Sequence, residues 1–229
     1  YYSSKIQIFS NVIGKLEICM SRLSYKKFRQ VKSEIRVLGI DDSVFIPRTK
    51  GEVDVVGVVF RGGQWLDGVM RTQIEIDGLD ATEKIVAMVK DSPHYEQLRV
   101  IMLNGITFAG FNVVDIKELF QKTELPVITV TREEPNFEDI KKALRNLPDY
   151  EKRWEAMKNA GEILKVQTRK GEEPMCVQVA GVSGSDAERI LKKTSTRSNV
   201  PEALRVAHII ASGLSQPKEK RTLTSKYAK

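Results

Sequence analysis

Short apolar runs in the first third of the chain are typical of β-strands. Residues 35–40 (IRVLGI) and 53–61 (VDVVGVVFR) are rich in β-branched side chains, which is typical of buried strands. Residues 65–77 alternate between polar and mostly apolar positions from residue 69 onwards, so one face of that strand is apolar. Gly62 and Gly63 mark a tight turn between the second and third runs. These patterns predict an antiparallel meander of three strands.

The rest of the chain alternates between helical and strand patterns. Apolar runs predict further strands at 98–103 and 126–131, and a late strand pair at 163–168 and 175–180. Helices are predicted from residue 80 and at 113–122, 136–147, 150–159, 185–193 and 201–212, with a glycine-containing loop at 108–112. This order predicts an α/β fold, in which an antiparallel meander is followed by parallel strands and helices flank the mixed sheet.

The composition indicates one domain with charged extensions. The chain has 229 residues and is 41% hydrophobic, which suits a single domain of good size. We expect this domain at 34–216, an N-terminal extension at 1–33 that is basic from about residue 20, and a basic tail at 217–229. The net charge of +7 comes from the two ends. The basic ends are interpreted either as arms that attract nucleic-acid phosphates or as solvated tails that aid solubility.

Targeting and disulfide signals are weak in this sequence. No apolar run reaches the roughly 18 residues that a membrane span needs, so no membrane partner is expected. The first residues lack the charged, apolar and small-residue order of a secretory signal. Cys19 and Cys176 form neither a disulfide framework nor a metal-binding pair by their spacing. These features favour a reducing, cytoplasmic location.

Polar side chains follow two of the predicted buried strands. Asp41 and Asp42 end the first strand, and adjacent side chains of a strand point to opposite faces, so only one of the two can enter a given cleft. A divalent cation offsets the cost of burying a carboxylate. Asn104 ends the fourth strand, and the carboxyl ends of parallel strands form a crevice where ligands bind. The sequence predicts a metal site there; the alternative is that Asp41 and Asn104 belong to ordinary turns.

Two further carboxylates and one histidine complete the candidate set. Asp80 and Glu83 open the first helix, where they supply a second carboxylate to the metal or form a helix cap with its capping-box partner. His208 lies on the last helix and shares a face with Leu204, so it is either an active-site or a packing histidine. The catalytic candidates are Asp41, Asp80, Glu83, Asn104 and His208, and the metal-binding candidates are Asp41, Asp80 and Asn104.

Several stretches, taken in order, resemble the endonuclease V family. Residues 38–45 (LGIDDSVF) are similar to that family's first strand, which ends in a metal-binding aspartate at the position of Asp41. Residues 101–111 (IMLNGITFAGF) place Asn104 where the family has its second metal-binding aspartate. Residues 125–133 (LPVITVTRE) and 179–193 (VAGVSGSDAERILKK) resemble later segments.

The closing segment carries the most specific similarity. Residues 197–208 (RSNVPEALRVAH) look like the family's Arg…Pro-Glu…Arg…Ala-His signature, whose histidine lies at the active site. The resemblance extends over about residues 35–212, and it is closest to a mostly archaeal family related to endonuclease V.

This resemblance implies a ribonuclease H-like fold and Mg²⁺- or Mn²⁺-dependent cleavage of phosphodiester bonds in DNA or RNA, with deaminated bases as the typical lesion. Asn104 departs from the family's carboxylate, which weakens the hold on a hard cation. The Pro-Tyr-Ile-Pro wedge is absent, and residues 74–78 (IEIDG) take its place. Asp80 and Glu83 are the candidate counterparts of the family's glutamate. We therefore expect a metal-dependent endonuclease; the rival is a non-catalytic nucleic-acid-binding or scaffolding protein that kept the fold.

Overall fold

A computed structural model describes residues 25–47 and 49–214 of the chain. The predicted basic tail at 217–229 and most of the predicted N-terminal extension lie outside these described residues. None of the helices within the described ranges is long and apolar enough to cross a membrane.

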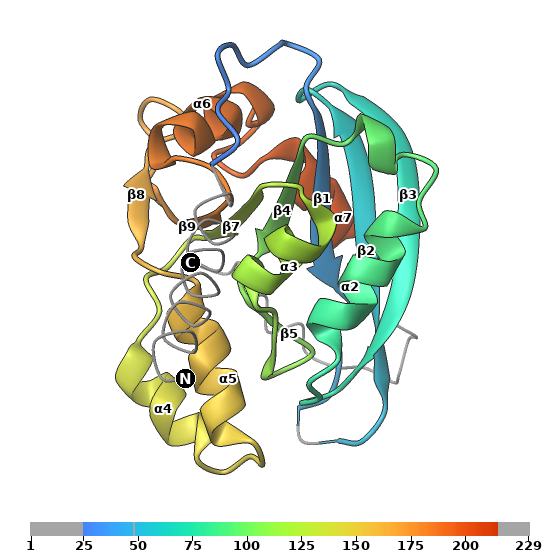
Figure 1. Cartoon of the computed structure of the whole chain (residues 1–229), viewed down its shortest axis with the longest axis vertical. Helices are drawn as coiled ribbons and strands as arrows, with labels where there is room; N and C mark the ends of the chain where they lie inside the picture. Colours follow the sequence, from blue (N-terminus) through green and yellow to red (C-terminus); the bar gives the residue numbers. More distant parts are fainter. Residues whose placement is uncertain (1–24, 48, 215–229) are drawn as a thin grey trace, which may run out of the picture.

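The described residues form one large mixed sheet with strand order β3-β2-β1-β4-β7-β9-β8 (Figure 1). Its strands are β1 (Arg36–Asp42), β2 (Glu52–Arg61), β3 (Trp65–Glu75), β4 (Val100–Asn104), β7 (Val127–Thr131), β8 (Leu164–Val166) and β9 (Met175–Ala180). Strands β1, β2 and β3 pair antiparallel, which confirms the predicted meander. Strands β1, β4 and β7 are parallel neighbours, and the late pair β8–β9 continues the sheet in antiparallel fashion.

Helices cover both faces of the sheet. They are α2 (Ala81–Lys90), α3 (Ile116–Thr123), α4 (Phe137–Leu144), α5 (Tyr150–Asn159), α6 (Gly184–Thr194) and α7 (Glu202–Leu214), with a short 3-10 turn at Tyr95–Gln97. Helices α2 and α3 pack in one apolar cluster with Leu38 and Ile40 of β1. Helices α6 and α7 pack in a second cluster with Val37 of β1. Figure 1 accordingly places α2 and α3 in front of the sheet and α7 behind β1.

Some predicted element boundaries differ from the observed ones. The predicted loop at 108–112 contributes to a small hairpin of β5 (Thr107–Phe108) and β6 (Asn112–Val113). Helix α3 starts later than predicted because the Asp115 carboxylate accepts hydrogen bonds from two backbone N–H groups of the first turn. Helix α6 is capped by Ser183, which accepts a hydrogen bond from the Asp186 N–H, and so begins before residue 185.

Helices α4 and α5 form a separate layer at one end of the sheet, below α3 in Figure 1. Arg153 of α5 is only 2% exposed, and burial lowers the pKa of its guanidinium. The guanidinium donates hydrogen bonds to the carbonyl oxygens of Asp77, Gly78, Phe111 and Pro148. This buried side chain therefore ties α5 to the loop between β3 and α2 and to the β5–β6 hairpin.

Candidate active site

The end of β1 lies against α7 at very close range. Gly39 faces the backbone of Ala203 and Leu204, and a methyl group added at Gly39 would lie only 2.6 Å from the Leu204 nitrogen. Asp41 follows on the same face of the strand, is 3% exposed, and accepts a 2.8 Å hydrogen bond from Nδ1 of His208. The missing side chain at residue 39 thus lets α7 bring its histidine onto the carboxylate.

This pairing defines the roles of the two ring nitrogens of His208. A carboxylate only accepts hydrogen bonds, so Nδ1 carries the proton that it donates to Asp41 Oδ2. The other carboxylate oxygen, Oδ1, accepts a 3.0 Å bond from the Asp42 N–H. Nε2 is then the nitrogen that can exchange a proton with a bound molecule.

Asn104 lies beside Asp41 because the two strands are parallel neighbours. The register pairs Ile40 with Leu103, and Asp41 and Asn104 are the next residues of each strand. Strand alternation puts Asn104 on the same face as Met102, which packs in the cluster that contains α7. Neighbouring strands lie about 4.8 Å apart, so the amide and the carboxylate face the same edge of the sheet.

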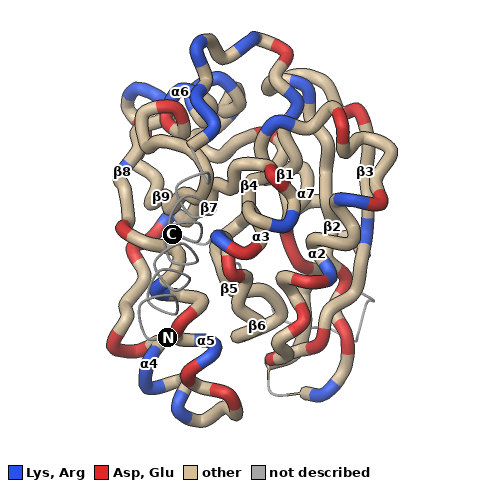
Figure 2. Tube along the Cα trace, in the orientation of Figure 1, with Lys and Arg blue, Asp and Glu red and all other residues tan. Residues whose placement is uncertain are grey.

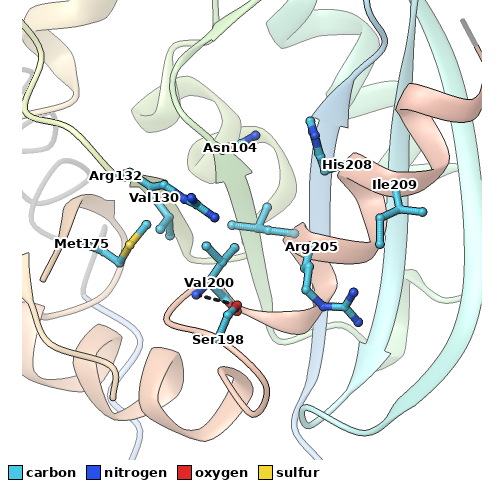
Figure 3. A pocket seen from close by; sticks show the side chains of 10 residues that line it. Asn104, Val130, Arg132, Met175, Ser198, Val200, Arg205, His208 and Ile209 are labelled. Carbon is cyan, nitrogen blue, oxygen red and sulfur yellow. Dashed lines mark hydrogen bonds between the residues drawn. The ribbon is translucent and has the colours of Figure 1, made fainter. Parts of the chain in front are cut away.

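A cavity of about 250 Å³ opens next to this pair (Figure 3). Figure 3 shows His208, Arg205 and Ile209 approaching from α7, while Asn104, Val130 and Arg132 lie opposite on the ends of β4 and β7. Its lining consists of Asn104, Val130, Arg132, Met175, Ser198, Val200, Leu204, Arg205, His208 and Ile209. Apolar walls with two arginines, an amide and an imidazole suit an anionic organic ligand.

Arg205 is held in place by a carboxylate behind it. Its Nε and one terminal nitrogen lie 2.9 and 2.7 Å from Oε2 of Glu202, whose side chain is almost completely buried. Oε1 of Glu202 accepts a 3.0 Å bond from the Arg197 N–H. Glu202 therefore fixes the conformation of Arg205, which lines the cavity, and this reduces the conformational entropy that the side chain loses on binding an anion.

Asp42 serves the opposite side of the sheet. Its Oδ2 accepts a 2.7 Å hydrogen bond from the N–H of Ala109, a residue with the positive φ of 44°. The expected separation of the two adjacent carboxylates is thus observed: Asp41 contacts α7, and Asp42 accepts a hydrogen bond from the turn between β5 and β6.

Asp80 and Glu83 do not join Asp41, and this expectation is wrong. The Asp80 carboxylate accepts hydrogen bonds from Asn112 Nδ2 at 2.6 Å and from the Glu75 N–H at 3.2 Å. Asp80 is the N-cap residue of α2, as predicted, but its side chain makes no capping hydrogen bond to the helix. Glu83 is exposed on α2, which packs on the face of the sheet opposite to α7. The sequence around Asp80 does not predict its hydrogen bond with Asn112.

Arg132 and Arg205 are cavity residues to which the sequence assigned no role. Arg205 belongs to the closing signature, three residues before His208, and this spacing places both on one side of α7. Arg132 follows β7 directly, at the sheet edge where the strands carrying Asp41 and Asn104 also end. Arg132 could have been predicted as a ligand-binding candidate, because it follows the carboxyl end of a parallel strand.

Comparison with known proteins identifies the family. The family model described as endonuclease dU matches residues 33–215. The chain belongs to the endonuclease dU family. A UPF0215 protein of Methanothermobacter thermautotrophicus is 55% identical over 188 residues, which are 82% of this chain and 91% of that relative.

Solved structures similar to this endonuclease dU family member define its fold. A crystal structure of an Archaeoglobus fulgidus protein has a TM-score of 0.72 and 41% identity, covering 80% of this chain and 99% of that one. Ciona intestinalis endonuclease V, in complex with a DNA containing an inosine, has a TM-score of 0.53 and 15% identity, covering 88% and 95% of the two chains. The expected relation to endonuclease V and the ribonuclease H-like fold are confirmed.

The side chains of this endonuclease dU family member fit an open metal site rather than a closed one. Among the residues that the structure describes, no group of three or more His, Cys, Asp or Glu side chains is placed to hold a metal ion. Asp41 and Asn104 offer one carboxylate and one amide oxygen side by side. Mg²⁺ is commonly held by one or two carboxylates together with substrate phosphates. These residues therefore fit a cation that the substrate helps to hold.

Proposed function

We propose that the protein is an endonuclease that hydrolyses phosphodiester bonds of nucleic acid at Asp41 and His208, with Mg²⁺ or Mn²⁺ held by Asp41 and Asn104. The observation that carries this proposal is the 2.8 Å bond between His208 Nδ1 and Asp41 Oδ2, at the carboxyl ends of parallel strands and beside the cavity. Membership of the endonuclease dU family supports it.

The residues around the cavity have distinct roles in this proposal. Arg205, fixed by Glu202, and Arg132 attract the phosphate and neutralise part of its charge. His208 donates a proton from Nε2 toward the leaving oxygen, while Asp41 holds the ring orientation and stabilises the charged imidazole. A divalent cation held by Asp41 and Asn104 would lower the pKa of water bound to it and would neutralise charge on the phosphate.

Deaminated bases are the proposed lesions. The family name refers to dU, and the Ciona intestinalis endonuclease V structure contains DNA with an inosine. Both deoxyuridine and deoxyinosine arise from loss of an exocyclic amino group, so we propose that a site of this family acts on the products of base deamination. The reaction would take place in the reducing cytoplasm, which the cysteine usage favours.

A substrate panel tests this function. Labelled single- and double-stranded DNA carrying one deoxyuridine or one deoxyinosine, undamaged DNA of the same sequence, and the matching RNA are incubated with the full chain. Mg²⁺, Mn²⁺ or a chelator is added to each. We expect metal-dependent strand cleavage near the deaminated base and none with the chelator. Binding without cleavage of any substrate in either metal would overturn the proposal.

Asn104→Asp is expected to strengthen metal binding. It adds a carboxylate next to Asp41, and the number of carboxylates sets the affinity for hard cations. Melting temperatures are measured with and without Mg²⁺ for the variant and the parent protein. A larger Mg²⁺-dependent increase in the variant is the expected result. If Asn104 instead donates its amide to a backbone carbonyl, the variant loses about 1–3 kcal/mol of stability and shows no larger response to Mg²⁺.

A non-catalytic nucleic-acid-binding protein is the second candidate function. It is favoured by Asn104 in place of a carboxylate and by the absence of an acidic cluster among the described residues. In that case Arg132 and Arg205 still bind phosphate, but no strand is cut. The substrate panel separates the two functions, because it measures binding and cleavage on the same nucleic acids.

A further inference from the structure

The segment before β1 is docked on α6. Phe28 and Val31 pack against the apolar cluster that contains α6. The Phe28 N–H donates a 3.1 Å hydrogen bond to Asp186 Oδ2, and Arg189 donates to the Phe28 carbonyl oxygen. These contacts fix the position of a segment that carries four basic side chains, Lys26, Lys27, Arg29 and Lys32.

An open groove runs between this segment and α6. It is lined by Arg29, Gln30, Val31, Arg189, Lys192 and Lys193. Four of these residues are cationic and none is acidic. Figure 2 shows Lys and Arg gathered around α6 and the segment that leads into β1.

The nearby acidic side chains leave part of this charge uncompensated. Asp186 pairs with Arg189 and Glu188 pairs with Lys192, at 3.2 and 2.6 Å. Arg29 and Lys193 are exposed and form no ion pair with any residue in the described ranges. A groove with at least two unneutralised cations attracts an extended polyanion more strongly than a single phosphate, because each neutralised phosphate releases counterions.

The chain between α6 and α7 connects the groove with the cavity. Lys193 lies at the end of α6, and Ser198 and Val200 of the following connection line the cavity beside His208. The connection is also held at its start, where Thr196 Oγ1 donates to the Gly63 carbonyl oxygen. The groove and the candidate active site therefore lie at the two ends of one short connection, and a nucleic acid that spans this connection can contact both.

We propose that this groove binds the phosphate backbone of the nucleic acid on one side of the bond to be cleaved. The inference rests on the proposed function, and it goes further by assigning a second, sequence-independent contact to α6 and residues 29–31. Contacts of this kind fix affinity and register and take no part in the chemistry. An acidic protein is the other class of partner with matching charge. Nucleic acid is favoured because the connection from the groove ends at a cavity lined by two arginines.

The experiment measures binding of uncleaved DNA as a function of salt. Full-length protein and the variant Arg29→Glu/Lys193→Glu are titrated with a labelled 24-base-pair duplex in chelator, by fluorescence anisotropy at several salt concentrations. We expect affinity to fall roughly tenfold or more at low salt. The slope of log K against log salt should become shallower by about 2, because each phosphate that the protein no longer neutralises removes about 0.9 from it. Cleavage at saturating DNA should be unchanged.

Lys90→Glu/Lys158→Glu is the matched control, because it reverses two exposed lysines on α2 and α5, away from the groove. Equal salt slopes in the groove variant and the control would overturn the proposal. A poly-glutamate peptide is also tested as a competitor of the labelled duplex. The proposal would be overturned if the peptide displaced the duplex from the parent protein as well as unlabelled DNA does, but did not displace it from the groove variant. Binding is measured in chelator, so the groove can be tested even if the protein has no cleavage activity. Failure of the proposed nuclease function is detected separately, by the substrate panel.

Discussion

Replacing Asp41 by asparagine is expected to reduce strand cleavage roughly a hundredfold or more, the scale of general acid–base catalysis. Asparagine keeps the shape of the side chain and can still accept the hydrogen bond from His208 Nδ1, but it carries no charge. In the proposed mechanism the protonated His208 then loses its counter-charge, and the proposed cation loses its one carboxylate ligand. Cleavage rates at saturating substrate provide the measurement.

The fold should tolerate this change. Asp41 is 3% exposed, and its two oxygens accept bonds from His208 and from the Asp42 N–H. The single amide oxygen of asparagine can accept only one of these bonds, and its NH₂ group then faces the other donor. We expect the free energy of unfolding to fall by about 1–3 kcal/mol, the cost of leaving one buried donor without an acceptor. Loss of activity in a folded protein distinguishes a chemical role from a structural one.

Asp42→Asn is the matched control, since it makes the same change one residue along the chain. Asp42 points to the other face of the sheet and holds the Ala109 N–H. Its variant should keep cleavage within about threefold while losing a few tenths to about 1.5 kcal/mol of stability. Equal activity losses in the two variants, or full activity in Asp41→Asn, would contradict the assignment of Asp41.

The sequence was sufficient for the meander, because strand alternation and the double glycine turn are local signals. The same alternation correctly required Asp41 and Asp42 to face opposite sides. It could not say which of them would meet a partner, since that depends on α7, which lies more than 150 residues later in the chain. The Arg…Pro-Glu…Arg…Ala-His signature at residues 197–208 did indicate that His208 belongs to the active site.

Asp80 and Glu83 show where sequence reasoning reaches its limit. Their spacing fits a capping box, and their place at the start of a helix after the meander fits the family's glutamate. In the structure the Asp80 carboxylate is bound by Asn112, 32 residues away. The bond to Asn112 takes the place of the capping bond that the local sequence favours. The sequence around Asp80 contains no pattern that predicts this bond.

Gly39 is a second residue whose role no local pattern indicates. A glycine inside an apolar strand suggests only a weak point or a close approach. The structure shows that the backbone of α7 occupies the space where its side chain would be. The distance between Asp41 and His208 therefore depends on a residue that contributes no side chain to the site.

Gly39→Ala is expected to lower both stability and cleavage. The added methyl group would meet the carbonyl group of Ala203 and lie 2.6 Å from the Leu204 nitrogen, closer than real Cβ contacts. Backbone atoms within a helix cannot rotate away as a side chain can, so α7 must shift as a unit. Overpacking of this kind costs about 1–3 kcal/mol, which chemical denaturation measures directly.

The shift also moves His208, which lies on the same helix about one turn beyond the point of contact. A displacement of the order of 1 Å at a catalytic group costs roughly a hundredfold in rate. Cleavage at saturating substrate, measured under conditions where the variant is fully folded, should therefore fall much more than the loss of folded protein explains. Gly213→Ala is the control, since Gly213 lies on α7 with open space around it. It should gain up to about 1 kcal/mol from helix propensity and keep full activity. A Gly39→Ala protein that unfolds more easily but cleaves normally when folded would show that the contact between β1 and α7 supports the fold without positioning His208.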